Sequence, residues 1–293
     1  MPRISIIIPN LNSKIIDLTL DALQRQEFDL SQIEVLVIGL DDQGLIQENE
    51  LVRWISTDVP ATPAVARNIG MQEAKGDLFC FTDADCIPET DWLARLTAPF
   101  KDADNSVVGG GVAFEAKNYW TLCDNLSWFY EYLSSASAGG RNLLPSLNLC
   151  VRRQVVDKVG LFDTSYPSAA GEDAEWTTRM RQAGFGLNFV PTAIVYHRPS
   201  RASFAAICRH AFRYGRHSIK IKSEYSEFLQ TPVFLRKWWA VLLLSPLLAT
   251  SVTVKVFMFD RALWRYWYAL PGILLSKIVW CLGAARSLWD IKA

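Results

Sequence analysis

Two aspartates, Asp83 and Asp85, lie one residue apart directly after the apolar run 78–81, which is typical of a buried strand. Carboxylates this close repel each other unless a cation lies nearby. Mg²⁺ and Mn²⁺ prefer carboxylate oxygen and often bind through one or two carboxylates together with substrate phosphates. The pattern therefore indicates a metal–diphosphate site. The alternative is an ordinary aspartate-rich turn, because a D-x-D pair is a short and common motif.

The elements that must position these aspartates alternate between strand and helix. Apolar runs predict buried strands over 4–8, 33–38, 51–55, 78–81 and 107–114, with short strands at 189–190 and 194–196. Helices are expected between them, including one that Thr62 caps, with Pro63 at its first position, and others over 91–100 and 174–182. This alternation implies an α/β fold with a mostly parallel sheet and helices on both faces. Ligands of such sheets bind at the carboxyl ends of the strands.

Several short stretches of this region follow one another in a distinctive order. They are ISIIIPN at 4–10, ARNIG at 66–70, AKGDL at 74–78, FTDADC at 81–86, SLNLCVRR at 146–153, VGLFD at 159–163, GEDAEW at 171–176 and YHRP at 196–199. In this order they resemble the motifs of family 2 glycosyltransferases over about residues 3–200. The resemblance implies the glycosyltransferase-A fold, a Rossmann-like sheet, and a nucleotide-sugar donor.

The resemblance also implies roles for individual residues. Asp85, with Asp83 beside it, would hold Mg²⁺ or Mn²⁺ against the donor diphosphate, where the metal neutralises charge on the leaving group. His197 is a third metal ligand or a diphosphate contact, and its alternative is a structural histidine at a strand end. Asp173, with Glu172 next to it, is the candidate general base for a single displacement with inversion. The alternative for this pair is a helix cap.

Other contacts follow from the same motifs. Arg67, at the start of a helix, is expected to reach the diphosphate, unless it lies on a solvated helix face. The remaining donor-binding candidates are Pro9, Asn10, Asp41 and Asn68. The candidates for acceptor or phosphate contacts are Asn148, Trp176, Arg198 and Arg213.

The chain departs from the family pattern at two places. In the family, the second strand usually ends in an acidic pair beside the nucleobase. Here Gly39 and Leu40 follow Ile38, so Asp41 arrives two residues later than the family pattern predicts. The Q-x-x-R-W motif of processive polysaccharide synthases is replaced by RMRQAG at 179–184. The second departure favours an enzyme that adds a single sugar.

The charge of the chain is divided between its two ends. The 293 residues carry 30 basic and 30 acidic side chains, and half of the chain is apolar, which excludes a disordered or fibrous protein. Residues 1–196 have a net charge of −11 and residues 197–293 a net charge of +11. The asymmetry suggests an anionic partner for the basic end.

Two long apolar runs, 238–259 and 263–285, occupy the C-terminal end. Each has about the ~20 residues that a membrane-spanning helix needs. Tryptophans near the ends of these runs and flanking cations favour a hydrophobic helical hairpin with both ends on the cytoplasmic side. The alternatives are helices lying in the membrane interface and a buried hairpin of a soluble protein. We therefore expect a catalytic domain at 1–223 and membrane-associating helices at 224–293.

Basic residues precede the apolar runs at helical spacing. If 202–222 is a helix, one cationic stripe contains Arg209, Arg213, Arg216 and Lys220. Membrane headgroups, a lipid-linked acceptor or the donor diphosphate would each complement the stripe, whose other interpretation is a solvated face. Nucleic acid is not an expected partner, because no nucleic-acid motif accompanies the stripe.

The six cysteines form no C-x-x-C pair, and the N-terminus has no signal-peptide pattern, which predicts buried thiols in the cytosol. The combined prediction is an inverting, non-processive, hexosyltransferase-type enzyme at the cytoplasmic face of the inner membrane. It would act in cell-envelope or exopolysaccharide assembly, on a glycan or lipid-linked acceptor. Its rivals are a sugar nucleotidyltransferase, although the turn at 9–14 lacks the glycine-rich loop, and a non-catalytic membrane scaffold.

Overall fold

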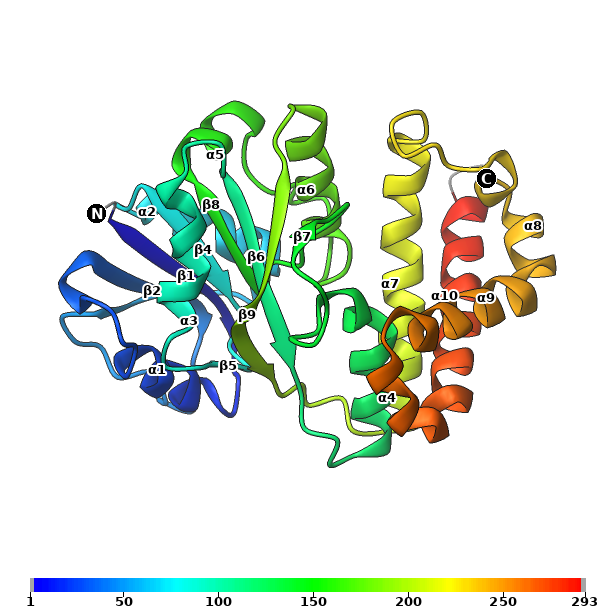
Figure 1. Cartoon of the computed structure of the whole chain (residues 1–293), viewed down its shortest axis with the longest axis horizontal. Coiled ribbons are helices and arrows are strands. Elements are labelled where there is room, and N and C mark those ends of the chain that lie inside the picture. The colour runs from blue at the N-terminus through cyan, green and yellow to red at the C-terminus, as the bar shows by residue number, and fades with distance from the viewer. Residues whose placement is uncertain (1–2, 291–293) are drawn as a thin grey trace. The chain divides into compact units, whose positions relative to one another are not determined.

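The computed structural model describes residues 3–290, whose strands form one mixed sheet (Figure 1). The strand order is β3-β2-β1-β4-β8-β6-β9-β5, and the short β7 pairs with β9. The strands are β1 (Ile4–Leu11), β2 (Ile33–Leu40), β3 (Val52–Ser56), β4 (Leu78–Thr82), β5 (Cys86–Pro88), β6 (Val107–Ala113), β7 (Gly139–Gly140), β8 (Asn148–Arg152) and β9 (Leu187–His197).

The first four strands form a parallel half-sheet, as the apolar runs predict. In the centre of this half-sheet, Ile4 of β1 lies opposite Ile33 of β2 and Leu78 of β4. Every residue of β4 is buried, which explains why its first four residues are all apolar rather than alternating with polar ones. The carboxyl ends of β1, β2 and β4 therefore meet at one edge of the sheet.

The other half of the sheet is mixed. Strand β8 runs antiparallel to β4 and β6, whereas β6 and β9 are parallel. The sequence predicts two short strands at 189–190 and 194–196, but the structure has a single strand, β9. A register shift opposite Gly110 and Gly111 accommodates the intervening residues, so the polar break in the sequence is an irregularity within one strand.

The helices of this part of the chain are α1 (Ile16–Gln24), η1 (Leu30–Gln32), α2 (Pro63–Glu73), α3 (Trp92–Thr97), η2 (Ala98–Lys101), α5 (Arg153–Val159) and α6 (Glu172–Gln182). Of these, α2 begins where the sequence predicts, the predicted helix at 91–100 is α3 followed by η2, and α6 begins at Glu172, two residues before the predicted 174. Helix α2 begins at Thr62, whose hydroxyl accepts a hydrogen bond from the amide of Val65, and Pro63 follows at the first position. It packs against β1 and β2.

The chain forms two compact units whose bounds differ from the predicted domains at 1–223 and 224–293. Unit 1 comprises Met1–Ala113 and Ser137–Arg198, and unit 2 comprises Phe114–Ala136 and Pro199–Ala293. Unit 2 contains α4 (Tyr119–Phe129), η3 (Tyr130–Tyr132), α7 (Phe204–Glu224), η4 (Val233–Arg236), α8 (Trp238–Leu243), α9 (Ser245–Phe259), η5 (Arg261–Ala269) and α10 (Leu270–Asp290). The segment between β6 and β7 thus belongs to the helical unit.

The first of the two apolar runs predicted to form the C-terminal hairpin is not one continuous helix. The run 238–259 is divided into α8 and α9, because the chain leaves helical geometry at Leu244 just before Pro246. Within unit 2, the apolar side chains of α4 pack against α9, η5 and α10 in one cluster that includes Leu122, Leu126 and Ile273. Unit 2 therefore has its own hydrophobic core.

Candidate functional site

The loop after β4 presents the two aspartates at the carboxyl edge of the sheet. The side chains of Asp83 and Asp85 are 31% and 30% exposed, whereas Ala84 between them is buried. The carbonyl of Ala84 accepts hydrogen bonds from the hydroxyls of Ser13 at 2.8 Å and Thr19 at 3.4 Å. These bonds tie the loop to the residues that follow β1, so both carboxylates remain at the surface.

His197 lies beside Asp85 because β5 pairs with the end of β9. In this pairing Cys86 is opposite His197, and the amide of Arg198 donates to the carbonyl of Asp85 at 2.8 Å. The buried His197 ring has its Nε2 3.9 Å from Asp85 Oδ1. The exposed side chain of Arg198 is on the following residue.

The side chains of Asp85 and His197 have the chemistry that a divalent cation prefers, but these two ligands alone would not complete its coordination. Within residues 3–290, no three His, Cys, Asp or Glu side chains are grouped as a metal site. An imidazole nitrogen and a carboxylate oxygen nevertheless lie within the span of two ligands of one ion. Mg²⁺ and Mn²⁺ commonly complete their coordination with substrate phosphate and water, so this pair fits a metal that binds together with a diphosphate.

The buried Arg67 links Asp83, which follows β4, to Glu172, which begins α6. Its guanidinium donates to Asp83 Oδ1 at 2.8 Å and to Glu172 Oε1 at 3.0 Å, and the side chain is 3% exposed. The sequence predicts a diphosphate contact or a solvated helix face for this residue. The structure instead places it inside the protein, because both of its terminal nitrogens bond carboxylates of unit 1.

Glu172 and Asp173 are the first two residues of helix α6. Asp173 accepts hydrogen bonds from the amides of Ser146 at 3.3 Å and Ala174 at 2.8 Å. The N-cap position is Gly171, and no side chain caps the helix there. The capping interpretation therefore describes Asp173 incompletely, since one of its oxygens also binds the loop before β8.

Burial changes the acidity of this pair. Burial raises the pKa of Glu172 to about 7, and the neighbouring charge of Asp173 adds to the effect, while Arg67 opposes it. Burial likewise raises the pKa of Asp173 above the usual aspartate value, against the lowering effect of Arg67. A carboxylate with a raised pKa is a stronger base than an ordinary aspartate, which suits proton abstraction near neutral pH.

Asp41 directly follows its strand rather than lying two residues late. Strand β2 continues through Gly39 and Leu40, where Gly39 pairs with Asn10 of β1. The Nδ2 of Asn10 donates to the carbonyl of Leu40 at 2.8 Å, and Asp41 Oδ2 accepts from the amide of Ile46 at 2.7 Å. The other carboxylate oxygen of Asp41 is buried and has no hydrogen-bond partner among the described residues.

Three predicted contact residues are occupied inside unit 1. Asn68 exchanges two hydrogen bonds of 2.9 Å with the backbone of Phe162. Asn148 is fully buried and bonds Trp92, Gly111 and Ala193. Trp176 is fully buried between aromatic rings, and its indole donates to the carbonyl of Gly160 at 2.8 Å. These side chains support the site but do not reach its surface, which differs from the predicted ligand contacts.

The last two predicted residues lie apart in the chain. Pro9 is partly buried in β1, next to Asn10. Arg213 is exposed on α7, in unit 2.

Sequence reasoning missed the residues that hold the site together. Ser13 and Ser146 act through a hydroxyl and a backbone amide, and neither lies in a motif that marks such a role. The link from Asp83 through Arg67 to Glu172 joins residues far apart in the chain, and no spacing rule predicts it.

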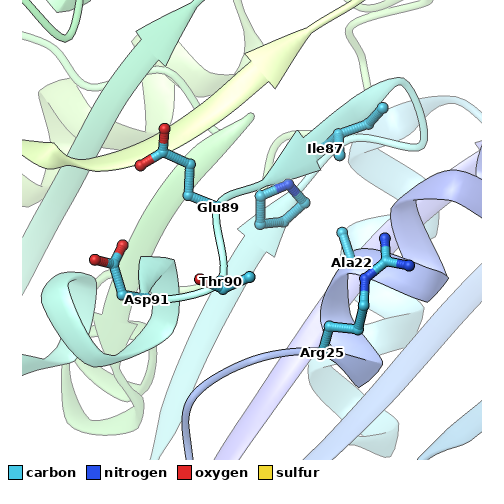
Figure 2. A pocket seen from close by; sticks show the side chains of 7 residues that line it. Ala22, Arg25, Ile87, Glu89, Thr90 and Asp91 are labelled. Carbon is cyan, nitrogen blue, oxygen red and sulfur yellow. The ribbon is translucent and has the colours of Figure 1, made fainter.

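A separate surface hollow lies at the C-terminal end of β5, whereas Asp85 precedes the N-terminal end of this strand (Figure 2). Its lining residues are Ala22, Arg25, Ile87, Pro88, Glu89, Thr90 and Asp91. Glu89 is engaged by the hydroxyl of Tyr196 at 3.0 Å. None of the predicted donor-binding or catalytic residues lines this hollow.

The sheet, with carboxylates at its strand ends, has the glycosyltransferase-A fold. A solved mannosyltransferase from Pyrobaculum calidifontis, in complex with GDP-mannose and Mn²⁺, matches 99% of this chain and 88% of its own, with a TM-score of 0.64 and 18% identity. The structure of GalNAc-T7 with UDP, GalNAc and Mn²⁺ matches 76% of this chain and 48% of its own, with a TM-score of 0.55 and 19% identity. At these identities the likeness establishes the fold.

The chain belongs to glycosyltransferase family 2, because the family model described as "Glycosyltransferase like family 2" matches residues 2–216. Glycosyltransferase AglE of Haloferax volcanii is 32% identical over 232 residues, covering 75% of this chain and 74% of AglE. The succinoglycan biosynthesis protein ExoM of Rhizobium meliloti is 26% identical over 220 residues, covering 74% and 69%. The protein is thus a nucleotide-sugar-dependent glycosyltransferase, which sets aside the nucleotidyltransferase and scaffold alternatives.

Proposed function

We propose that this enzyme transfers one hexose with inversion, at the cytoplasmic face of the inner membrane, during cell-envelope or exopolysaccharide assembly. The observation that carries the proposal is the Asp173 carboxylate, which has a raised pKa and is linked through Glu172 and Arg67 to the donor-side Asp83. A single base positioned against the donor side is the arrangement that one-step inversion requires.

The donor side consists of the strand ends around Asp85. Asp85 and His197 would hold Mn²⁺ or Mg²⁺, and the ion would neutralise the charge of the leaving nucleotide diphosphate. Asp83 is held by Arg67, so it contributes negative charge from a fixed position. Asp41, which directly follows β2 at the sheet edge, is the candidate contact to the nucleoside.

Asp173 is the proposed catalytic base. Its Oδ1 and Oδ2 are oriented by the amides of Ala174 and Ser146. It would accept the proton of an acceptor hydroxyl as that oxygen attacks the anomeric carbon. Glu172 is protonated more readily than an ordinary glutamate, because burial raises its pKa to about 7.

Single addition is supported by the segment after the catalytic pair. Arg179 is held by Glu175 at 2.6 Å and by the carbonyls of Val159 and Leu161. The place of the processive motif is thus taken by a side chain that joins α5 and α6 structurally.

The acceptor and its location are supported by the division of the chain. The segment 114–136 leaves unit 1 after β6 and packs into the apolar core of unit 2. A segment that leaves the catalytic unit and joins an apolar helical unit suits a glycan acceptor carried on a lipid. The involvement of the relative ExoM in succinoglycan biosynthesis supports a role in polysaccharide assembly.

The test is the variant Asp173→Asn. It should retain metal-dependent protection by nucleotide diphosphates against thermal unfolding, because the donor side is unchanged. Transfer should fall by about 10²–10⁴-fold, the usual contribution of a general base. The matched control is Asp157→Asn, a change of the same kind on the exposed side of α5. Equal turnover in Asp173→Asn and the control would remove Asp173 from the mechanism.

A further inference from the structure

We propose that unit 2 lies on the surface of an anionic lipid bilayer as a monotopic anchor, with residues of η4, α8, α9 and η5 in the headgroup region, and that α10 does not cross the membrane. The inference deepens the membrane location given above and rests on it.

Helix α10 is the core helix of unit 2. Among the described residues, one helical stretch, Arg261–Asp290, is long and apolar enough to span, and half of its apolar window is buried. Close backbone contacts pack α10 against α7. A Cβ added to Gly215 would meet the carbonyl oxygen of Trp280 at 2.1 Å, and one added to Gly283 would meet that of Phe212 at 2.0 Å. The apolar surface of α10 is therefore largely used for packing within the protein.

Polar contacts also hold α10 in the unit. Lys277 is 8% exposed, and its Nζ donates to the carbonyl of Ser127 at 2.6 Å and lies 3.7 Å from the ring centroid of Trp128. Insertion of α10 into lipid would separate Lys277 from these partners of α4. A lysine in the hydrocarbon core without its partners is strongly unfavourable.

The partner helix α7 cannot accompany α10 into a bilayer. It carries Arg209 and Arg213 on its exposed side, and Arg216 forms an ion pair with Asp290 at 3.0 Å. Since α7 and α10 are in contact along their backbones, a spanning α10 would place these arginines at membrane depth. Keeping the packing and crossing the bilayer are therefore incompatible.

Other elements of unit 2 expose apolar side chains to solvent. Of the large apolar side chains that are exposed among residues 3–290, all but Leu11, Leu18 and Val59 lie in unit 2. Those of α8, α9 and η5 are Trp239, Leu242, Leu243, Leu247, Val254, Met258, Phe259, Trp264, Trp267 and Tyr268. Exposed apolar surface of this extent marks an interaction site. Helix α9 is about 22 Å long, shorter than the ~30 Å hydrocarbon core.

The charge and the aromatic residues of unit 2 indicate that its exposed apolar surface binds a lipid bilayer. Unit 2 has 15 basic and seven acidic side chains. Exposed cations adjoin the exposed tryptophans, since Arg236 and Lys237 precede Trp239, and Arg261 and Arg265 flank Trp264. Tryptophan prefers the membrane–water interface, and clustered basic residues attract anionic headgroups. A protein partner would not require this combination.

The first experiment adds the full-length protein to preformed sealed vesicles of phosphatidylcholine, with or without phosphatidylglycerol. Flotation should occur with the anionic vesicles and weaken as salt is added. Leu243→Glu and Met258→Glu should each weaken binding at least about tenfold, because each removes a large apolar side chain from the interface. The matched control, Leu18→Glu on α1, should bind as the wild type does. Equal weakening by the control would overturn the assigned surface.

The second experiment determines on which side η5 lies. Cysteines are introduced at Ala262 in η5 and at Lys101 in unit 1, in a Cys208→Ser background that removes the partly exposed native thiol. On protein bound to sealed vesicles, a membrane-impermeant maleimide should label both positions equally. Labelling of the Ala262→Cys protein only after detergent is added would show that α9 and α10 cross, and would overturn the monotopic arrangement while leaving the membrane location intact.

The flotation experiment also tests the proposed membrane location itself. If the wild type floats with no vesicle composition, both this inference and the proposed membrane location fail. Protection of the same sample by nucleotide diphosphate and Mn²⁺ would show that the catalytic unit was folded in that experiment.

Discussion

Arg67 is the residue on which the site of unit 1 depends. Its guanidinium binds Asp83, which follows β4, and Glu172, which begins α6. Arginine is suited to this role because its planar group presents several donors in a fixed geometry. The buried charge of Arg67 would be uncompensated without both carboxylates, so the donor side and the catalytic pair are positioned by one side chain.

Replacement of Arg67 tests this dependence. Arg67→Lys keeps the charge but cannot present two separate donors to Asp83 and Glu172 at the same distances. We expect a loss of about 1–3 kcal/mol in the free energy of unfolding, because one of the two buried carboxylates loses its hydrogen-bond donor. Urea denaturation of the variant and of Arg53→Lys measures it; Arg53 forms a similar bond to Glu73 but at the surface. A loss of the same size in both variants would contradict the argument.

The acidity of the catalytic pair predicts opposite pH trends for activity and stability. A base must be deprotonated, so the rate should fall on the acid side at a pH above the usual aspartate range, since the pKa of Asp173 is raised. The folded state binds a proton at Glu172 more tightly than the unfolded state does. Its contribution to stability is therefore full below 4.5, the ordinary pKa of a glutamate, and is lost as pH rises to about 7.

Measurements of kcat/KM and of unfolding free energy against pH check both trends. Glu172→Gln should flatten the decline in stability between these pH values, because the variant has no proton to lose there. If stability instead rises with pH in the wild type over this interval, the assigned raised pKa of Glu172 is wrong.

At the scale of elements, the end of β2 shows how a strand can bring an acid to the site. The sequence suggests that the strand ends at Ile38, but β2 continues to Leu40 and so delivers Asp41 at the sheet edge. Gly39 makes this extension compatible with β1, since its φ is +132° and an added Cβ would lie 1.9 Å from the carbonyl oxygen of Asn10. The residue that looks like a missing acid is a requirement of strand pairing.

Gly39→Ala and Gly44→Ala separate steric clash from backbone strain. Both glycines have positive φ, but a Cβ at Gly44 would meet nothing within 4 Å. Gly44→Ala should therefore cost about 1 kcal/mol of unfolding free energy, from strain alone. Gly39→Ala should cost at least about 2 kcal/mol more and weaken nucleotide binding, because β1 and β2 must separate. Thermal unfolding with and without nucleotide diphosphate measures both effects. Equal costs in the two variants would show that the close approach is not important.

At the scale of the whole molecule, the two units do not follow the order of the chain. The segment 114–136 contributes Leu122 and Leu126 to a cluster completed by residues such as Val256 and Ile273. A buried ion cluster adds to this link, since Asp124 accepts hydrogen bonds from Arg201 at 2.6 Å and His210 at 2.7 Å. The helical unit is therefore folded with a piece of the central chain, rather than appended to its end.

Truncation should expose this dependence. A chain ending at residue 229 lacks α8, α9 and α10 but retains α4, so the apolar side chains that α10 covers become exposed. We expect the truncated protein to aggregate rather than behave as a soluble catalytic domain. Light scattering and nucleotide protection compare it with a second version that ends at Arg198 and replaces 114–136 by a flexible linker. If the simple truncation is monomeric and binds nucleotide normally, the two segments are not one folding unit.

The sequence by itself determined the class of fold, the positions of β1, β2, β3, β4 and β6, the N-terminus of α2 and the family, because these depend on local periodicity, capping residues and short motifs. The tertiary structure decided the partners of Arg67, the interior positions of Asn148 and Trp176, and the place of α4 in the helical unit. It also decided that the first apolar run forms two helices and that half of the apolar window of the α10 stretch is buried within the protein. The reason is physical: side-chain partners and burial are set by contacts between residues far apart in the chain, and hydropathy alone does not distinguish an apolar helix that faces lipid from one that faces protein.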